Sequence, residues 1–320
     1  MTGHADDAIE RRTHGRAADG PTDVPATSWW ATLKRTVSEF RDDNLTDWAA
    51  SLTYYAVLAI FPALIALVSI LGLVGQSATQ PLLDNLQTLA PGPANQILTD
   101  AITNITETQS SAGFALILGL LGALWSSSGY VGAFGRASNA IYEVEEGRPF
   151  WKLRPLQIVI TVVMITLLAL CAVAVVITGP VAEEVGGLVG AGDAAVTAWD
   201  IAKWPVIALV VITLFAILYW ASPNVRQPAF KWITPGGVLA VVLWVLASAA
   251  FAFFVANFGS YNATYGSIAS VIVFLVWLWI TNLAILFGAE LNAELERSRE
   301  IDAGVPEGET IALEPRQSAD

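Results

Sequence analysis

The most constraining feature of this sequence is the stretch from Ile268 to Gly288, which contains no charged side chain. At about 1.5 Å per residue, a helix of this length crosses a hydrocarbon core of about 30 Å. The sequence then becomes polar at Glu290, Asn292 and Glu294. This pattern predicts a membrane-crossing helix that continues into water.

Five other segments share this apolar character, at about 49–74, 112–134, 156–178, 204–221 and 234–257. The whole chain is 55% hydrophobic and only 14% charged, whereas charged residues make up about 25% of a typical soluble domain. The sequence therefore predicts an all-α, polytopic membrane protein with six transmembrane helices.

The segment before the first span has the composition of an amphipathic helix. Trp30, Leu33, Val37 and Phe40 fall on one helical face, and basic residues lie on the other. Such a helix fits the membrane interface, although packing on the protein's own surface would explain the pattern equally well. The predicted organisation is a disordered cytoplasmic tail (1–27), an interfacial helix (28–45), a six-span membrane domain (46–290), and a cytoplasmic helix end with a second disordered tail (291–320).

The positions of Lys and Arg predict the orientation. One set of connections holds nearly all those close to the spans: Lys34, Arg35, Arg41, Arg136, Arg148, Lys152, Arg154, Arg226, Lys231, Arg297 and Arg299. The opposite connections contain only Lys203. Because basic residues accumulate on the cytoplasmic side, this alternation predicts a multi-pass protein of the cell membrane with both termini in the cytoplasm.

Short motifs at the two ends of the membrane domain resemble a known family. They are Ala50-Ser51-Leu52-Thr53-Tyr54-Tyr55 with Phe61-Pro62, Tyr265-Gly266-Ser267, Leu275-Val276-Trp277-Leu278-Trp279, and Gly288-Ala289-Glu290-Leu291-Asn292-Ala293. They are similar to the YihY/BrkB family of bacterial inner-membrane proteins, and the resemblance covers about residues 30–300. It implies six membrane helices with cytoplasmic termini and links to envelope integrity, serum resistance and export of lipids or lipopolysaccharide precursors. The family's old label, ribonuclease BN, is generally regarded as a misassignment.

The residues themselves argue against an enzyme and against nucleic-acid binding. Metal-dependent RNA cleavage needs clustered His and carboxylate ligands, but the only histidines, His4 and His14, lie in the N-terminal tail. The acidic pairs Glu145-Glu146 and Glu183-Glu184 are interpreted as solvated loop charges. No basic stripe suitable for nucleic acid is present, and no cofactor or metal is expected.

None of the six predicted spans contains an ionisable Asp, Glu, Lys, Arg or His. Proton-coupled carriers place such groups at membrane depth, so coupled ion transport is disfavoured. Two hypotheses remain. In the first, the protein handles or exports a lipid or other amphiphilic envelope component through a cytoplasm-facing polar groove. In the second, it is a non-transporting scaffold that docks envelope proteins. The expected partners are membrane lipids and, for the scaffold, envelope proteins.

Polar residues of the first, second and sixth spans share the cytoplasmic leaflet. Since polar side chains avoid lipid, we expect them to converge, with Arg136 contacting an anionic headgroup and pairing with Glu290 or Asp47. The predicted polar pocket comprises Asp47, Ser51, Tyr54, Tyr55, Ser127, Tyr130, Arg136, Asn282 and Glu290. The same residues could instead be interhelical hydrogen-bonding groups without a ligand. Pro62 predicts a kink in the first span.

Overall fold

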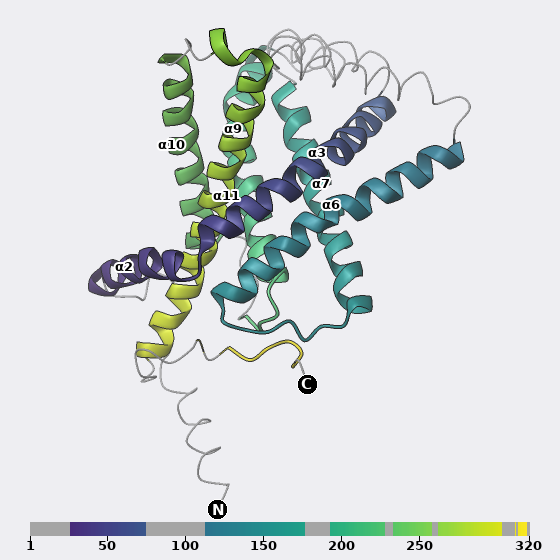
Figure 1. Cartoon of the computed structure of the whole chain (residues 1–320). Coiled ribbons are helices and arrows are strands. Elements are labelled where there is room, and N and C mark those ends of the chain that lie inside the picture. Colours follow the sequence, from purple (N-terminus) through teal and green to yellow (C-terminus); the bar gives the residue numbers. More distant parts are fainter. Residues whose placement is uncertain are drawn as a thin grey trace, which may run out of the picture.

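The computed structural model describes residues 26–74, 113–176, 193–227, 233–257, 262–302, 311 and 313–318. The fold is all-α, as predicted (Figure 1). The helices are α2 (Ala26–Asp42), α3 (Leu45–Val74), α6 (Gly113–Ile141), α7 (Phe150–Val176), α9 (Asp193–Ala221), α10 (Pro235–Asn257) and α11 (Asn262–Asp302). Residues 1–25 of the predicted tail (1–27), the whole predicted loop between the first two spans and residues 177–192 lie outside the described residues.

Four of the described helices are long and apolar enough to cross a membrane. They are Phe150–Val175, Ala194–Ala221, Pro235–Val255 and Val271–Ile301, in α7, α9, α10 and α11. The other two predicted spans fall on α3 and α6, which lie side by side and inclined to α10 and α11 (Figure 1). The side chains of 60–74 and 113–120 are outside those described, so the six-span model and the Pro62 kink stay predictions.

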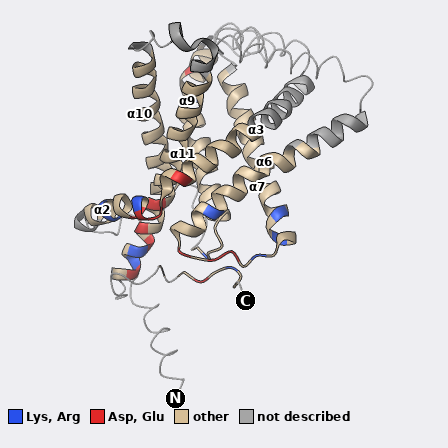
Figure 2. Cartoon of the chain, in the orientation of Figure 1, with Lys and Arg blue, Asp and Glu red and all other residues tan. Residues whose placement is uncertain are grey.

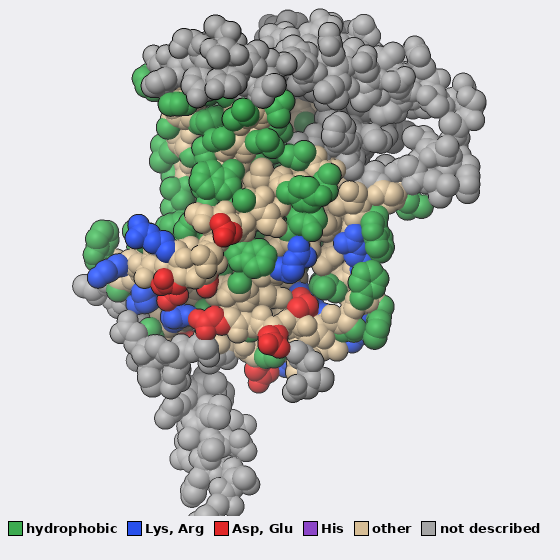
Figure 3. Space-filling view, in the orientation of Figure 1, with side chains coloured by type: hydrophobic (Ala, Val, Ile, Leu, Met, Phe, Trp, Pro, Cys, Tyr) green, Lys and Arg blue, Asp and Glu red, His purple; other side chains and the backbone are tan. Residues whose placement is uncertain are grey.

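The buried core lies in one half of the bundle. Its largest buried apolar side chains include Leu52, Phe134, Leu218 and Leu286, from α3, α6, α9 and α11. Toward the other end, apolar side chains lie on the surface and cover α9, α10 and α11 in the view of Figure 3. This distribution suits lipid around the apolar half, because lipid takes the place of a protein core there.

Helices α10 and α11 approach each other closely where two glycines meet. A Cβ on Gly288 would overlap the carbonyl oxygen of Gly236 and would lie 2.7 Å from the Tyr219 hydroxyl. That hydroxyl donates a hydrogen bond to the Ile285 carbonyl at 2.7 Å. Small residues permit such backbone contact between membrane helices. At the start of α10, the Thr234 Oγ1 accepts a hydrogen bond from the Gly237 N–H at 3.0 Å, which caps the helix.

Helix α2 packs on the protein with its polar side and exposes an apolar edge. Thr32 is fully buried and its hydroxyl lies 2.7 Å from that of Ser298 in α11, while the Arg35 Nε contacts Glu294 at 2.8 Å. Trp30 is 74% exposed, and Leu33 and Val37 are also exposed. The helix therefore packs on the protein's own surface, and its placement at the membrane interface stays a prediction.

Charged side chains gather at the end of the bundle that bears α2 and the α6–α7 connection, here called the charged end (Figure 2). The C-terminal residues also pack there. Pro315 pairs with Val225 in an antiparallel bridge, and Ile311 is buried in the core. In the segment predicted as a cytoplasmic helix end and disordered tail (291–320), helix α11 thus continues to Asp302 and residues 313–318 lie against the domain. Main-chain pairing and the burial of an apolar residue order a segment whose composition is polar.

Candidate functional site

Two residues of the predicted pocket, Tyr130 and Asn282, form a continuous hydrogen-bonded chain with Thr53 between three helices. The Tyr130 hydroxyl of α6 donates to Asn282 Oδ1 of α11 at 2.9 Å. Asn282 Nδ2 donates to the Thr53 Oγ1 of α3 at 3.1 Å, and that hydroxyl donates to the Ala49 carbonyl at 2.8 Å. Asn282 and Thr53 are buried. These hydrogen bonds occupy the polar groups of the chain, so their arrangement is that of interhelical packing.

Arg136 faces a different region. Its guanidinium carbon lies 5.7 Å from the centre of the Tyr55 ring, a cation–π distance. Among the described residues, Arg136 forms no ion pair with Glu290, with Asp47 or with any other acid. The expected pairing is therefore absent from the structure, because Arg136 and Glu290 face different neighbours.

A cavity of about 160 Å³ opens beside Arg136, between α6, α7 and the end of α9. It is lined by Val131, Gly132, Gly135, Arg136, Glu146, Leu153, Leu156, Gln157, Ile160, Ala221 and Ser222. Two glycines of α6 bring the walls together. A Cβ on Gly132 would lie 3.1 Å from Gln157 Nε2, and one on Gly135 would lie 3.3 Å from the Ser222 carbonyl oxygen.

The acid in the cavity wall is neutralised by a neighbour. Arg148 contacts both carboxylate oxygens of Glu146, with Nε and Nη2 each at 2.7 Å, and Asn139 donates to the same carboxylate at 3.0 Å. Burial alone would raise the pKa of Glu146, but the hydrogen bonds from Arg148 lower it below its usual value. The carboxylate is thus ionised and paired, which leaves Arg136 as the unpaired charge of the lining.

Ser222 supplies a second unsatisfied polar group. Its Oγ is buried and has no hydrogen-bond partner within the described part of the chain. The opposite wall is apolar, formed by Leu153, Leu156 and Ile160 of α7. The cavity therefore combines an unpaired cation and an unpaired hydroxyl with an apolar wall, which suits a ligand that has an anionic head and an apolar body.

Glu290 lies in a separate cluster beneath α2. It is 1% exposed, and its Oε2 has no hydrogen-bond partner among the residues described. The charged groups acting on it are Asp43, Glu294, Glu39 and Arg297. Arg297 in turn contacts Glu143 at 3.1 Å and Glu294 at 3.1 Å. The acid is thus held at the α2–α11 junction and not at the cavity.

Of the remaining predicted pocket residues, some lie on the surface and others are buried between helices. Asp47 is exposed in the first turn of α3, Ser51 is half-buried, and Ser127 is buried. Tyr54 is 62% exposed and meets Tyr55 edge-on, with ring centres 5.3 Å apart. Of the predicted set, the cavity lining includes Arg136 alone, with Tyr55 stacked behind it.

Sequence reasoning missed Glu146, Arg148, Gln157 and Ser222. Glu146 and Arg148 are two residues apart and form an ion pair. That spacing could have suggested that Glu146 is paired with an arginine and is not a solvated loop charge. Ser222 comes directly after the predicted fourth span, at about 204–221, and was given no role. Gln157 is a lone amide side chain near the start of an apolar span. Because polar side chains avoid lipid, it could have indicated a site that faces the protein and not the membrane.

The fold and the cavity define an all-helical, polytopic membrane protein with a small cavity at its charged end, lined mostly by apolar residues and by a few polar ones. The chain belongs to the Virulence factor BrkB family, whose model matches residues 36–310.

Three relatives illustrate the similarity. The chain is 32% identical to YfkH of Bacillus subtilis (strain 168), whose name describes it as ribonuclease-like, over 79% of this chain and 90% of that protein. It is 31% identical to a UPF0761 membrane protein of Alkalilimnicola ehrlichii over 80% of this chain. It is 27% identical to a UPF0761 membrane protein of Rhodospirillum centenum over 86%. The matches span only 56% and 60% of the latter two proteins. No solved structure matches the chain.

Proposed function

We propose that this chain is a six-span protein of the cell membrane, with both termini in the cytoplasm, that handles an anionic amphiphile through the cavity beside Arg136. The observation that carries the proposal is the composition of that cavity. Arg136 has no ion-pair partner in the described residues, while the neighbouring Glu146 is already paired with Arg148. The lining thus favours an anion.

The side chains near the cavity favour a lipid headgroup over a free solute. Trp125, Phe150 and Trp151 are exposed on α6 and α7 close to the cavity, and Arg154 stacks on Trp125 with its guanidinium carbon 4.1 Å from the ring centre. Aromatic and basic residues of this kind gather where headgroups meet water. The apolar wall formed by α7 then lies at the depth of the upper acyl chain. Export or another form of handling follows from the resemblance to the family.

We further propose that the protein is not an enzyme and binds no nucleic acid. The ribonuclease-like name belongs to the Bacillus subtilis relative. In the part of the chain that the structure describes, no group of three or more His, Cys, Asp and Glu side chains could hold a metal ion. Arg136, Gln157 and Ser222 offer binding groups but no general base.

The alternative function is a scaffold that docks envelope proteins, and α10 is the observation in its favour. Val242, Val245, Leu246 and Phe253 of this helix are all exposed. Lipid or a partner helix would cover such a face equally well. The amphiphile proposal is preferred because the cavity offers the Arg136 side chain, which has no ion-pair partner among the described residues, and an apolar docking face gives that side chain no role.

The experiment compares Arg136→Ala and Arg136→Lys with Arg226→Ala, the matched control. Arg226 is exposed and pairs only with the exposed Glu314. Binding of a fluorescent anionic lipid and of its zwitterionic analogue is measured on the protein in nanodiscs. We expect Arg136→Ala to abolish the preference for the anionic lipid, Arg136→Lys to restore part of it, and Arg226→Ala to have no effect. An unchanged preference in Arg136→Ala would refute the proposal.

A further inference from the structure

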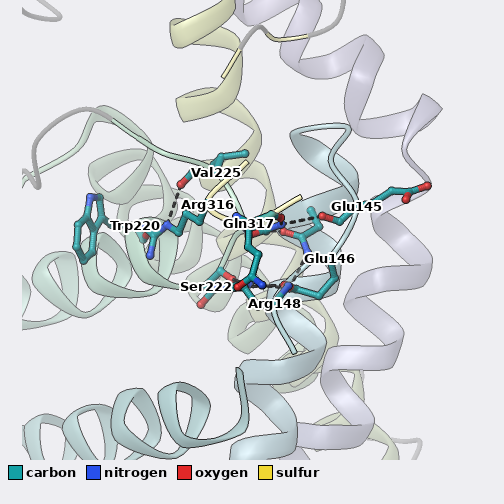
Figure 4. Close-up of polar contacts among 10 residues, drawn as sticks. Glu145, Glu146, Arg148, Trp220, Ser222, Val225, Arg316 and Gln317 are labelled. Atoms are coloured by element: carbon teal, nitrogen blue, oxygen red, sulfur yellow. Dashed lines mark hydrogen bonds and ion pairs between the residues drawn. The ribbon is translucent and has the colours of Figure 1, made fainter. Parts of the chain in front are cut away.

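The C-terminal segment, residues 313–318, lies between two connections of the membrane domain (Figure 4). One is the α6–α7 connection at 142–149, and the other follows α9 at 222–227. The Arg226 N–H donates to the Glu314 carbonyl at 2.8 Å, and the Arg316 N–H donates to the Asn224 carbonyl at 2.9 Å. Pro315 lies between these two bonds, where a missing N–H costs no ladder hydrogen bond.

Asn224 extends this pairing with its side chain. Its Nδ2 donates to the Gln317 carbonyl at 2.8 Å and to the Glu145 carbonyl at 2.9 Å. Its Oδ1 accepts from the Gln317 N–H at 3.3 Å. Asn224 is fully buried. One side chain therefore joins the C-terminal segment to both connections through main-chain groups.

Arg316 provides the side-chain specificity. Its Nε donates to the Val225 carbonyl at 2.9 Å and its Nη2 to the Trp220 carbonyl at 2.5 Å. Its guanidinium carbon lies 4.9 Å from the centre of the Trp220 ring. Figure 4 shows this side chain against the end of α9. Charge-assisted hydrogen bonds and cation–π contact make it the strongest individual contact of the segment.

Gly147 permits the segment to lie directly on the α6–α7 connection. A Cβ at this position would overlap the carbonyl oxygens of Gln317 and Ser318. The backbone angles of Gly147 do not fall in the left-handed region, so the requirement for glycine is one of space. An alanine at 147 would thus exclude the segment without straining its own backbone.

Each of the two connections also contributes one residue to the lining of the cavity. Glu146 belongs to the first and Ser222 to the second, and both line the cavity. Arg148 links them, since its Nη2 donates to Glu146 Oε2 at 2.7 Å and to the Ser222 carbonyl at 2.7 Å (Figure 4). The C-terminal segment lies behind this link and contacts both connections.

We propose that the surface formed by 142–149 and 222–227 is a docking site for the chain's own C-terminal segment, and that the docked segment acts as a clamp that fixes the cavity wall. Release of the segment leaves three described polar contacts between the two connections: the Arg148 link, the Asn224 bond to the Glu145 carbonyl, and the bond that Gln227 Nε2 donates to the Tyr142 hydroxyl at 3.2 Å. The clamp is independent of the ligand that the cavity binds. Its test therefore succeeds or fails separately from the proposed function.

The test is hydrogen exchange by mass spectrometry on the full chain in nanodiscs. Gly147→Ala and Arg316→Ala remove the docking from opposite sides, one by exclusion and the other by loss of the arginine contacts. Glu314→Ala is the control, because that side chain is exposed and pairs only with the exposed Arg226. We expect exchange in 142–149 and 222–227 to accelerate about tenfold or more in the first two variants, the scale of hydrogen bonds to a charged group.

The outcomes are distinguishable. The clamp is supported if Gly147→Ala and Arg316→Ala exchange faster in both connections while their rates in α6, α7 and α9 are unchanged. Glu314→Ala should leave all these rates unchanged. Faster exchange confined to 313–318 would overturn the clamp, since the segment would then be passive. Faster exchange in all helices would also overturn it, in favour of a general role in folding. If Gly147→Ala does not fold, Arg316→Ala and Arg316→Lys decide the question alone, and the lysine variant should recover part of the protection.

Discussion

Asn282 offers the sharpest test of what holds the bundle together. Its side chain joins α11 to α6 through Tyr130 and to α3 through Thr53. Asn282→Ala removes both hydrogen bonds at once. Thr53 keeps its bond to the Ala49 carbonyl, so the Tyr130 hydroxyl is the only one of the partners left unpaired.

The expected magnitude follows from these two bonds. Interhelical hydrogen bonds in membrane proteins contribute about 0.6 kcal/mol each. The two bonds therefore amount to about 1.2 kcal/mol, and the unpaired Tyr130 hydroxyl can raise the loss to about 2 kcal/mol. Tyr130→Phe removes one bond with little change in shape and should cost about 0.6 kcal/mol. Thr53→Ser keeps the hydroxyl and serves as the control, with a smaller loss from its missing methyl group.

The assay is reversible unfolding in mixed micelles with an increasing fraction of denaturing detergent, run as a double-mutant cycle of Tyr130→Phe and Asn282→Ala. We expect a coupling free energy of about 0.6 kcal/mol between the two sites. A coupling of zero would show that the hydrogen bond contributes nothing to stability and would refute the reasoning. So would an Asn282→Ala variant as stable as the wild-type protein.

Three further predictions follow from the described residues and from the topology. Gly288→Ala should lower the free energy of unfolding by about 1–3 kcal/mol, because its Cβ would overlap α10. Gly122→Ala is the control and should leave that free energy unchanged, because nothing lies within 4 Å of its added Cβ. Equal effects of the two substitutions in a thermal-unfolding assay would contradict the prediction. Burial, and then the nearby Glu39, raise the pKa of Asp43 to about 6, so folding takes up a proton between about pH 4 and pH 6 and stability falls as the pH rises through that window. Asp43→Asn should therefore be more stable than wild type at pH 7 and equal to it near pH 4, and a difference that persisted at pH 4 would count against the shift. A cytoplasm-dependent reporter should be active within 143–150 or after residue 320 and inactive within 95–108, which lies outside the described residues; activity at the last site would overturn the topology.

Hydropathy predicted the apolar cores of the spans but not where the helices end. Helix α9 begins at Asp193, well before the predicted start at about 204, and α11 continues to Asp302. Both extensions carry charge pairs within one turn, such as Asp200 with Lys203 and Glu296 with Arg299. Such pairs stabilise a helix after it leaves the apolar layer. A hydropathy pattern detects the residues that lie in the apolar layer of the membrane. It therefore does not show how far a helix extends beyond that layer.

The sequence predicted which polar residues lie at the same height along the bundle, but not which neighbouring helix each side chain faces. Residues of one leaflet share a height along the membrane normal, and the structure brings Thr53, Tyr130 and Asn282 into contact. Arg136 and Glu290 were assigned to the same leaflet, yet one faces α7 and α9 and the other faces α2. Height follows from the sequence because each residue advances a helix by a fixed rise. Which neighbour a side chain meets depends on how whole helices pack.

The C-terminal segment shows a different limit. Two of its hydrogen bonds join main-chain groups about ninety positions apart, such as Arg316 N–H to the Asn224 carbonyl, and most of the others join a side chain to a main-chain group. A short polar stretch with one proline has no periodicity from which such pairing could be inferred. Ile311 was the usable signal, since a buried aliphatic residue in a polar tail needs a partner surface.

The separation of the hydrogen-bonded chain from the cavity makes packing and binding independently testable. Asn282 joins three helices and does not line the cavity, so Asn282→Ala should lower stability while the preference for an anionic lipid is kept. Arg136 lines the cavity and is exposed, and its described contact is the Tyr55 ring at 5.7 Å, worth about 0.5–1 kcal/mol at an exposed site. Arg136→Ala should therefore abolish the lipid preference with a smaller loss of stability. If both substitutions changed stability and lipid preference in the same proportion, the polar residues would act as one unit, and the division that the contacts define would not hold.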